Sequence, residues 1–511
     1  MPHPGSPVAR RGSSITVPTP MSRRTTLTAI PTAVYPAAAV ALLALAANAA
    51  ALRNGFAGDD VPIVQKNAVV HGFGDLRHLL LGSYWPGTRE LYRPLTLLSF
   101  ATDWTLSGGS PTWLHAVNLL LHAGVCVLLL LLLVRLGAHR WAAAAAVGLF
   151  AVHPVHVEAV ANLVGRGELL AALFVVAACL VHLRPGPSSP ARVAAVCACY
   201  FLGLAGKEIA VTLPALLLVL DWFRSREGGE VPRRLPALVR ARLPLLVAMA
   251  GVLALFLALR VQVTGGATGT GAAPYLADLS TGRRLLVALS LWPQYVRLLV
   301  WPADLSFDWG PGILAIPAGV TPAVAMGVGC ILLLALAARR DGETGRGWIA
   351  LAVLWFGFAI LPVSQVAFPL GTLLAERTLY LPSVALVMAV QPLWALLGRT
   401  RAAAVPAAVA LAVLLAMGGW WSWRRSAVWA STPAIRADLA AHHPESWRAI
   451  WDRASESAAA GRMGDALEHY TRALELTHAN EPGVNTEAAA YLLEIGSPVT
   501  AEGLCRRTLA Y

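Results

Sequence analysis

Long apolar stretches recur along this chain, and each comes close to the roughly 20 residues that a helix needs to cross a bilayer. Shorter polar segments separate them. Because irregular backbone cannot face lipid, the pattern predicts an all-α, polytopic bundle of about eleven transmembrane helices. The expected spans are residues 30–52, 113–135, 141–154, 168–183, 191–206, 208–223, 243–263, 316–338, 347–366, 378–397 and 402–421.

The arginines between these stretches predict the orientation of the bundle. Cationic residues favour cytoplasmic loops, and here they collect before the first span and in alternate loops. They are Arg10, Arg11, Arg23, Arg24, Arg135, Arg140, Arg184, Arg192, Arg224, Arg226, Arg233, Arg234, Arg240, Arg242, Arg339, Arg340, Arg346, Arg399 and Arg401. An odd number of spans then places the first large loop, residues 53–112, outside the cytoplasm. We interpret residues 283–301 as an interfacial helix, because a twelfth crossing would spoil the alternation.

The same pattern divides the chain into three regions. They are a cytoplasmic tail, a membrane domain and an extracytoplasmic domain, at residues 1–29, 30–421 and 422–511. Residues 446–477 are expected to form two amphipathic helices joined at Gly461, with the spacing of a tetratricopeptide helical hairpin. Residues 484–510 suggest a second, weaker pair. The first apolar stretch can alternatively be a cleaved signal peptide, since residues 46–49 include small side chains.

The composition supports a membrane protein and limits the other classes. Hydrophobic residues make up 57% of the 511 residues and charged residues 13%, so the bilayer is the expected solvent. The formal net charge of +12 could suit nucleic acid, but the arginines are dispersed among short loops, so we expect no nucleic-acid partner. Five of the six cysteines lie in apolar stretches, which predicts no disulfide framework.

Two adjacent carboxylates, Asp59 and Asp60, follow the first span where it meets the outer face. A partly desolvated carboxylate at this place can bind an acceptor hydroxyl and take its proton as a general base. The pair can alternatively bind a divalent cation through its oxygens. The structural alternative is a solvated turn with an aspartate helix cap.

Arg93, in the segment Tyr92-Arg93-Pro94-Leu95-Thr96, is a candidate phosphate ligand in the first outer loop. A guanidinium offers forked donors that match the oxygens of a lipid phosphate leaving group. The structural alternative is an arginine that extends to the membrane interface.

A dense polar segment, His153-Pro154-Val155-His156-Val157-Glu158, follows the third span. His153, His156 and Glu158 could in principle bind zinc, but Pro154 breaks the helix that would align them. We therefore expect these side chains to form a hydrogen-bonded scaffold beneath the site. Arg166, a few residues later, is a second candidate for anion contact.

Two further pairs of adjacent opposite charges lie at predicted outer ends of spans. In each pair the two residues either bind one another, or the cation meets a ligand phosphate. The pairs are Lys207 with Glu208, and Glu376 with Arg377.

Taken together, these motifs resemble the transmembrane O-mannosyltransferases with tetratricopeptide repeats, a family of the GT-C glycosyltransferase superfamily. The resemblance covers nearly the whole chain, and the ordered series of motifs is more specific than any one of them. The motifs are Asp59-Asp60, Tyr92-Arg93-Pro94-Leu95-Thr96, His153-Pro154-Val155-His156-Val157-Glu158, Val164-Gly165-Arg166, Gly206-Lys207-Glu208, Leu305-Ser306-Phe307-Asp308, Glu376-Arg377 and Tyr380-Leu381-Pro382-Ser383.

The resemblance implies a GT-C-type bundle that transfers a sugar from a polyprenyl-phosphate donor to Ser or Thr hydroxyls of exported protein, on the extracytoplasmic face. The sugar is expected to be a hexose such as mannose, and the protein acceptor can bind the tetratricopeptide hairpin. Arginine-rich and alanine-rich sequence suggests a bacterial inner-membrane protein with an undecaprenyl carrier. Without a nucleotide-binding fingerprint, a nucleotide sugar is not expected as the direct donor.

The mechanism implied is a single displacement with inversion. In it, Asp59 or Asp60 deprotonates the acceptor hydroxyl, and Arg93, Arg166, Lys207 and Arg377 bind the donor phosphate. The expected scaffold comprises His153, His156, Glu158, Glu208 and Glu376. No cofactor is expected beyond the divalent cation considered at Asp59 and Asp60.

Two alternatives remain open at this stage, and a third is disfavoured. One is a non-catalytic membrane-anchored scaffold whose terminal hairpin gathers partners. Another is a GT-C enzyme that modifies lipid or glycan. A flippase for the lipid-linked sugar is disfavoured, since it would need polar groups deep in several spans.

Overall fold

The computed structural model describes residues 34–226, 234–266, 273–277, 279–344, 347–367, 370–397 and 401–509. Within these ranges every regular element is helical, which confirms the all-α prediction. The expected tail, residues 1–29, lies outside the described residues, and so do seven of the arginines used for orientation, four in the tail and three in the loops. They are Arg10, Arg11, Arg23, Arg24, Arg233, Arg346 and Arg399.

A helical element occupies each of the predicted spans. The elements are α1 (Val34–Asn48), α4 (Pro111–Arg135), α5 (Arg140–Ala151), α7 (Arg166–His182), α8 (Pro190–Gly206), α9 (Leu213–Arg226), α10 (Leu235–Thr264), α13 (Pro322–Thr344), α14 (Trp348–Ile360), α15 (Val384–Ala389), α16 (Gln391–Leu397) and α17 (Arg401–Val428). Of the described helices, six are long and apolar enough to cross a membrane, and three more apolar helices are shorter. The chain is therefore a multi-pass membrane protein, while the count of eleven crossings stays a prediction.

Proline explains two differences between the predicted spans and the helices. The span expected at 316–338 begins later, at Pro322, because Pro317 and Gly319 interrupt the apolar run before it. Helix α5 ends at Ala151, and the chain turns by 56° into the short helical segment Pro154–Val160. The turn follows from Pro154, which cannot continue the hydrogen-bond ladder of α5.

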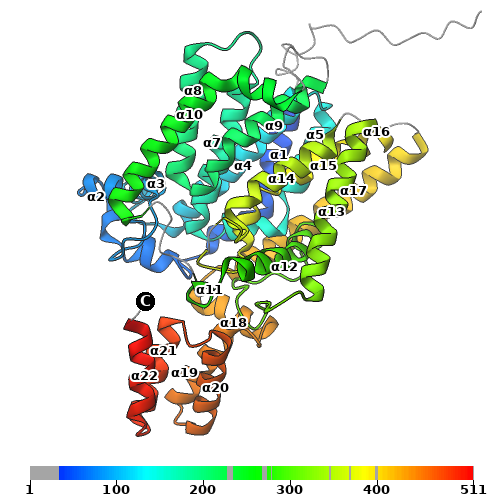
Figure 1. Ribbon diagram of the computed structural model, residues 1–511. Coiled ribbons are helices and arrows are strands. Elements are labelled where there is room, and N and C mark those ends of the chain that lie inside the picture. Colours follow the sequence, from blue (N-terminus) through cyan, green and yellow to red (C-terminus); the bar gives the residue numbers. More distant parts are fainter. Residues whose placement is uncertain are drawn as a thin grey trace, which may run out of the picture.

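Helix α12 (Thr281–Val300) covers the region expected to be interfacial. Its buried side chains recur every three or four residues, as on one face of a helix. They are Val287, Ala288, Leu291, Tyr295, Leu298 and Leu299. The helix packs against α13 at the lower end of the bundle in Figure 1.

The first outer loop folds into a small unit with its own apolar core. It contains α2 (Leu76–Leu81) and α3 (Pro94–Ser107), together with shorter helical turns. Buried side chains such as Ile63, Leu79 and Phe100 pack there with Leu163 from the segment after α5. The contact with Leu163 fixes the first loop against the polar segment of the bundle.

Beyond the bundle, α18 (Thr432–His442) leads to two helical hairpins. They are α19 (Trp447–Ala459) with α20 (Met463–Leu476), and α21 (Pro482–Glu494) with α22 (Pro498–Leu509). These helices fall at the two predicted pairs, and Gly461, with φ of +69°, forms the first turn. Helix α17 continues to Val428, past the predicted boundary at 421, since residues 421–428 contain neither Gly nor Pro.

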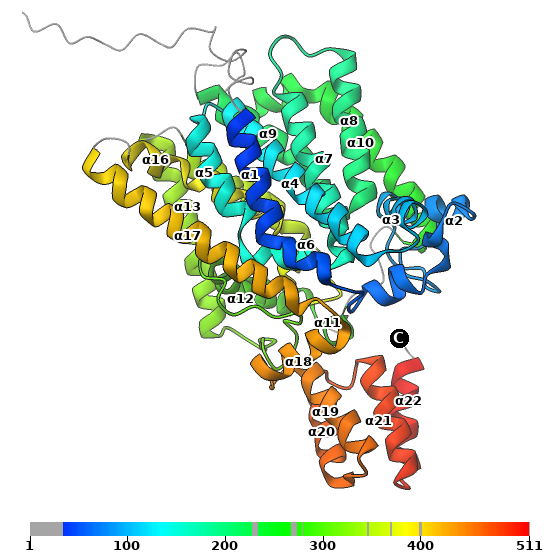
Figure 2. The same cartoon turned by 180° about the vertical axis from the view of Figure 1, so that it is seen from behind.

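The two views show the C-terminal hairpins at the lower end of the bundle (Figures 1 and 2). The loop that joins α7 to α8, which contains Arg184, lies at the opposite end. The hairpins and this loop therefore lie at opposite ends of the bundle, while the extracytoplasmic placement of the hairpins stays a prediction.

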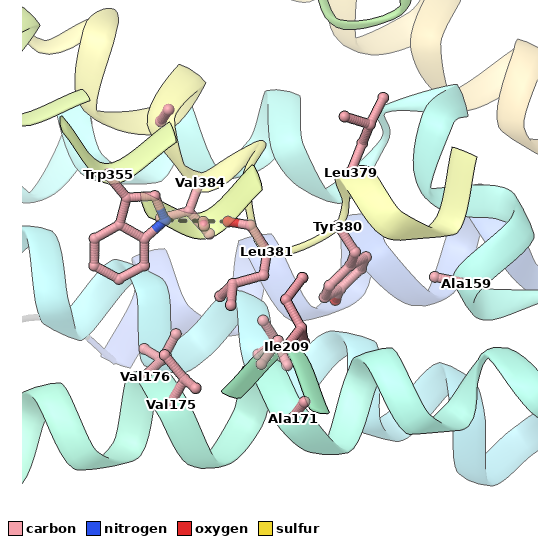
Figure 3. Close-up of a cluster of buried hydrophobic side chains, with 14 of the residues drawn as sticks. Ala159, Ala171, Val175, Val176, Ile209, Trp355, Leu379, Tyr380, Leu381 and Val384 are labelled. Carbon is pink, nitrogen blue, oxygen red and sulfur yellow. Dashed lines mark hydrogen bonds between the residues drawn. The ribbon is translucent and has the colours of Figure 1, made fainter. Parts of the chain in front are cut away.

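A buried apolar cluster supports the segment that follows Glu376 and Arg377. Figure 3 shows Tyr380 and Leu381 extending toward the side of the cluster formed by α7, whereas Leu379 points away from this helix. The Trp355 indole donates to the carbonyl oxygen of Leu381 at 3.1 Å. This packing fixes the position of the two charged residues just before the cluster.

All six cysteines are free thiols. Cys126 and Cys179 are buried in the bundle, and Cys197, Cys199 and Cys330 are partly buried within apolar helices. Cys505, on α22, is the exposed one.

Candidate active site

The structure separates the roles of the two adjacent aspartates. Asp60 is fully buried, and its two carboxylate oxygens accept from the backbone N–H groups of Ala57 at 3.3 Å and Val164 at 2.9 Å. Burial raises the pKa of Asp60 to about 7, although these backbone hydrogen bonds oppose the increase. Asp60 therefore ties the first outer loop to the segment before Arg166.

Asp59 is partly exposed, and its carboxylate makes no hydrogen bond with any residue that the structure describes. Its negative charge acts on Arg377, where it supports the protonated guanidinium. Of the two aspartates, Asp59 is thus the one that can contact another molecule.

Three cations near these aspartates each pair with a carboxylate from another segment. Arg93 donates to Glu208 from Nε at 3.1 Å and from Nη2 at 2.9 Å. The Lys207 ammonium pairs with Glu168, and the Arg377 guanidinium pairs with Glu158. The cationic side chains keep 13%, 13% and 23% of their surface exposed, so each still reaches solvent.

These cations belong to one electrostatic cluster. Burial lowers the pKa of Lys207, Glu168 opposes this effect, and the neighbouring guanidiniums of Arg93 and Arg377 lower the pKa further. The three positive charges therefore act on one another, although each is also paired with a carboxylate.

Lys207 and Glu208 do not bind one another, so the interpretation of these neighbours as an ion pair is wrong. Lys207 has extended backbone, with φ of −159° and ψ of 146°, so its side chain and that of Glu208 point in opposite directions. Glu208 instead lies between two guanidiniums, those of Arg93 and Arg260, the latter at 2.9 Å.

Arg166 is corrected from a phosphate ligand to a structural residue. Its side chain is fully buried, and each guanidinium nitrogen already has a protein acceptor. Nε donates to Asn118 at 2.7 Å, Nη2 to the carbonyl of Leu114 at 2.9 Å, and Nη1 forms an ion pair with Asp103. Four of its five N–H donors have protein acceptors and the side chain is fully buried, so Arg166 supports the wall behind Asp60.

The histidines form the scaffold expected of them. His153 contacts the carbonyl of Leu299 at 3.0 Å, and His156 contacts both the carbonyl of Phe150 and the hydroxyl of Ser383 at 2.8 Å. These bonds connect the bend after α5 to α12 and to the segment before α15. Both rings are thus committed to protein partners.

Glu376 binds a different part of the chain from Arg377. Its Oε1 accepts from the backbone N–H of Ser306 at 2.6 Å and from the indole of Trp309 at 3.0 Å. Burial raises the pKa of Glu376 to about 8, while Arg425 opposes the increase. The motif Leu305-Ser306-Phe307-Asp308 is thereby placed next to the site.

The residues do not fit the divalent cation considered for the two aspartates. Both oxygens of Asp60 already accept backbone N–H groups, which leaves Asp59 as the one carboxylate free to bind. Among the described residues, no group of three or more His, Cys, Asp and Glu side chains is arranged to hold a metal ion. We therefore assign no step to a metal.

Four residues that support the site were not found from the sequence. They are Asp103, Asn118, His122 and Arg260. Asn118, His122 and Arg260 lie within long apolar helices, where a polar side chain is costly unless it has a partner. That cost is the signal that could have identified them.

Comparison with known proteins finds relatives in animals. The chain is 30% identical to mouse protein O-mannosyl-transferase TMTC3 over 376 residues, which cover 66% of this chain and 40% of the relative. It is 28% identical to human protein O-mannosyl-transferase TMTC1 over 507 residues, 88% of this chain and 56% of the relative. For Drosophila melanogaster protein O-mannosyl-transferase Tmtc2, identity is 32% over 272 residues, 50% of this chain and 28% of the relative.

The chain spans about 40% to 56% of the length of the mouse TMTC3 and human TMTC1 relatives. No protein-family model matches it, and no solved structure does. The bacterial origin expected from composition stays a prediction. Over most of its length, this multi-pass membrane protein is homologous to the animal protein O-mannosyl-transferases named TMTC.

Proposed function

We propose that this protein is a membrane glycosyltransferase that moves a sugar from a polyprenyl-phosphate carrier to Ser or Thr hydroxyls of exported protein. The observation that carries the proposal is the free carboxylate of Asp59, which acts on Arg377, a member of the cluster of partly exposed cations that also contains Arg93 and Lys207. Homology to protein O-mannosyl-transferases supports a hexose such as mannose as the sugar.

Asp59 acts as the general base in this proposal. It accepts the proton of the acceptor hydroxyl while the hydroxyl oxygen forms a bond to the anomeric carbon. The bond from that carbon to the phosphate oxygen breaks on the opposite face, and its electron pair stays on the phosphate. One displacement therefore inverts the anomeric configuration and releases polyprenyl phosphate.

The cations have donors left for the phosphate. Arg93 binds Glu208 through Nε and Nη2, so Nη1 is available. Arg377 uses one guanidinium nitrogen for Glu158, and the Lys207 ammonium uses one of its three hydrogens for Glu168. Fixed cations of this kind stabilise the charge that develops on a leaving phosphate.

The remaining parts of the proposal concern location and partners. The arginine pattern supports an extracytoplasmic site. The Arg-rich and Ala-rich sequence supports a bacterial inner membrane, in which the carrier is undecaprenyl phosphate. The C-terminal hairpins, at the same end of the bundle as α12, are the proposed contact for the protein acceptor.

The test is transfer of label by the purified full chain in detergent. The donor is radiolabelled polyprenyl-phosphate mannose, and the acceptor is an extract of exported proteins. We expect labelled protein from the native chain and a loss of roughly 100-fold or more in Asp59→Asn, since a general base contributes 10²- to 10⁴-fold.

Asp75→Asn is the matched control, because Asp75 lies in the same loop as the exposed cap of α2 and asparagine caps a helix equally well. We expect it to keep native activity. Label on lipid or glycan instead of protein would contradict the proposed acceptor. Full activity of Asp59→Asn would contradict the proposed base.

A further inference from the structure

The segment between α12 and α13 lies in contact with both the candidate site and the C-terminal hairpins. We call its residues 305–312 the bridging loop. Ser306, Asp308 and Trp309 within it are buried, with exposed fractions of 1%, 7% and 2%. A polar loop buried to this extent must satisfy its hydrogen bonds with protein partners.

One side of the bridging loop binds the start of α19. The Asp308 carboxylate accepts from Nε of Arg448 at 3.2 Å through Oδ1 and from the Ser446 hydroxyl at 3.2 Å through Oδ2. The backbone N–H of Trp447 donates to the carbonyl of Pro311 at 3.1 Å. Three consecutive residues of α19 and its cap are thus bound to the loop.

The approach on this side is too close for side chains at two loop positions. A Cβ added at Gly310 would lie 2.4 Å from the Trp447 indole nitrogen, and one at Gly312 would lie 2.0 Å from the carbonyl oxygen of Glu445. The loop backbone therefore packs closely against the Trp447 indole at Gly310 and against the backbone of Glu445 at Gly312.

The other side of the bridging loop binds the candidate site. Ser306 and Trp309 both donate to Glu376, whose neighbour Arg377 is paired with Glu158 and acted on by Asp59. Direct contacts therefore lead from Arg448 through Asp308, Trp309 and Glu376 to the proposed phosphate ligand Arg377.

We propose that the bridging loop fixes the C-terminal hairpins in register with Arg377, so that Asp308 and Glu376 are positioning residues for transfer to protein acceptors. A protein acceptor bound by the hairpins then presents its hydroxyl at a set distance from Asp59. A short peptide, which reaches Asp59 without the hairpins, does not depend on the Asp308 contact. The kinetic test of this inference rests on the proposed function, because it measures sugar transfer.

The kinetic test compares two acceptors with the full chain in detergent and polyprenyl-phosphate mannose. One acceptor is the extract of exported proteins, and the other is a short Ser/Thr peptide. For Arg448→Ala and Asp308→Asn we expect KM for the protein acceptor to rise tenfold or more, with kcat and peptide KM unchanged. Arg448→Lys keeps the charge and should restore part of the loss.

Arg436→Ala is the matched control. It removes an ion pair with Asp452 that joins α18 to α19 at 3.1 Å and does not touch the bridging loop. We expect native kinetics for both acceptors. Equal losses with protein and peptide, or the same effect in Arg436→Ala, would overturn the proposal.

Amide hydrogen exchange of the full chain tests whether the C-terminal hairpins are coupled to the candidate site, and it needs no assay of transfer. In Arg448→Ala we expect faster exchange both at residues 446–450 and in the bridging loop, whose Ser306 N–H donates to Glu376. Faster exchange confined to α19 would overturn the proposal. If the native chain fails to transfer label while exchange changes at both places, the proposed function fails and the coupling stands.

Discussion

Arg377 donates to the carboxylate of Glu158 twice, from its backbone N–H at 2.9 Å and from its guanidinium, across 219 positions of sequence. The two contacts fasten the segment before α15 to the bend after α5. Glu158 is 1% exposed, so the pair has little competition from water. Glu158 binds the Arg377 guanidinium through Nη1, and 23% of the Arg377 side-chain surface stays exposed.

Removing the carboxylate of Glu158 should destabilise the protein strongly. In Glu158→Ala, Arg377 loses its acceptor, and breaking a buried ion pair from one side costs about 3–5 kcal/mol. We expect a large drop in the melting temperature in detergent. Glu343→Ala, which breaks an exposed pair with Arg339 on α13, is the control and should cost roughly 0.5 kcal/mol or less. Similar losses in the two variants would contradict the role of the buried pair.

Asp60 should make the unfolding free energy fall as pH rises. Its pKa is about 7 in the folded protein and near 3.8 when exposed, so between these values the folded state keeps a proton that the unfolded state has lost. Each pKa unit corresponds to about 1.4 kcal/mol, so the decrease amounts to a few kcal/mol.

The measurement for Asp60 is stability from pH 4 to 8 for the native chain and Asp60→Asn. Glu376, with a pKa of about 8, contributes a slope of the same sign, so Glu376→Gln is measured alongside. We expect each variant to lose part of the slope. An unchanged slope in Asp60→Asn would contradict the raised pKa of Asp60.

The Tyr380 hydroxyl should contribute measurably to stability through His122. Nδ1 of His122 lies 2.6 Å from this hydroxyl, and both side chains are buried. Tyr380→Phe leaves the imidazole nitrogen without a partner, which costs about 1–3 kcal/mol.

Tyr200→Phe is the control for Tyr380→Phe. The Tyr200 hydroxyl is buried without a hydrogen-bond partner among the described residues, so its removal should leave the melting temperature unchanged or raise it. A decrease in Tyr200→Phe as large as that in Tyr380→Phe would show that the ring and not the hydroxyl bond is responsible.

A methyl group at Gly165 should disrupt the site scaffold. Its Cβ would lie 2.5 Å from the carbonyl oxygen of Ala159, a backbone atom that cannot move aside cheaply. We expect Gly165→Ala to reduce folded yield, with a cost of about 1–3 kcal/mol or more from overpacking. Gly251→Ala, where nothing lies within 4 Å, should instead stabilise α10 by up to about 1 kcal/mol. Native yield of Gly165→Ala would contradict this close approach.

The positions of the helices could be predicted from the sequence because they depend on local composition. The apolar runs of α4 and α8 coincide with their predicted spans within a few residues. The C-terminal hairpins could also be predicted, because small and aromatic residues recur there at helical spacing. Boundaries failed where proline decided them, as at Pro322 and Pro154.

The pairing of the charged residues could not be predicted in the same way. Sequence order suggested that Lys207 and Glu208 bind each other, but the packing of α7 and α10 supplies Glu168 and Arg260 as their partners. Arg166 was expected to bind a ligand phosphate, because its actual partner Asp103 lies 63 positions away and could not be recognised from the sequence. Partners of this kind are set by tertiary contacts, which hydrophobic periodicity does not encode.

The exposure of Cys505 gives the native chain a ready marker of membrane sidedness. The other five thiols are shielded within the bundle or lie in its apolar helices, so a maleimide that cannot cross the bilayer should modify α22 first. Applied to intact cells, such a reagent reports which compartment the C-terminal hairpins occupy. No cysteine needs to be added or removed for this experiment.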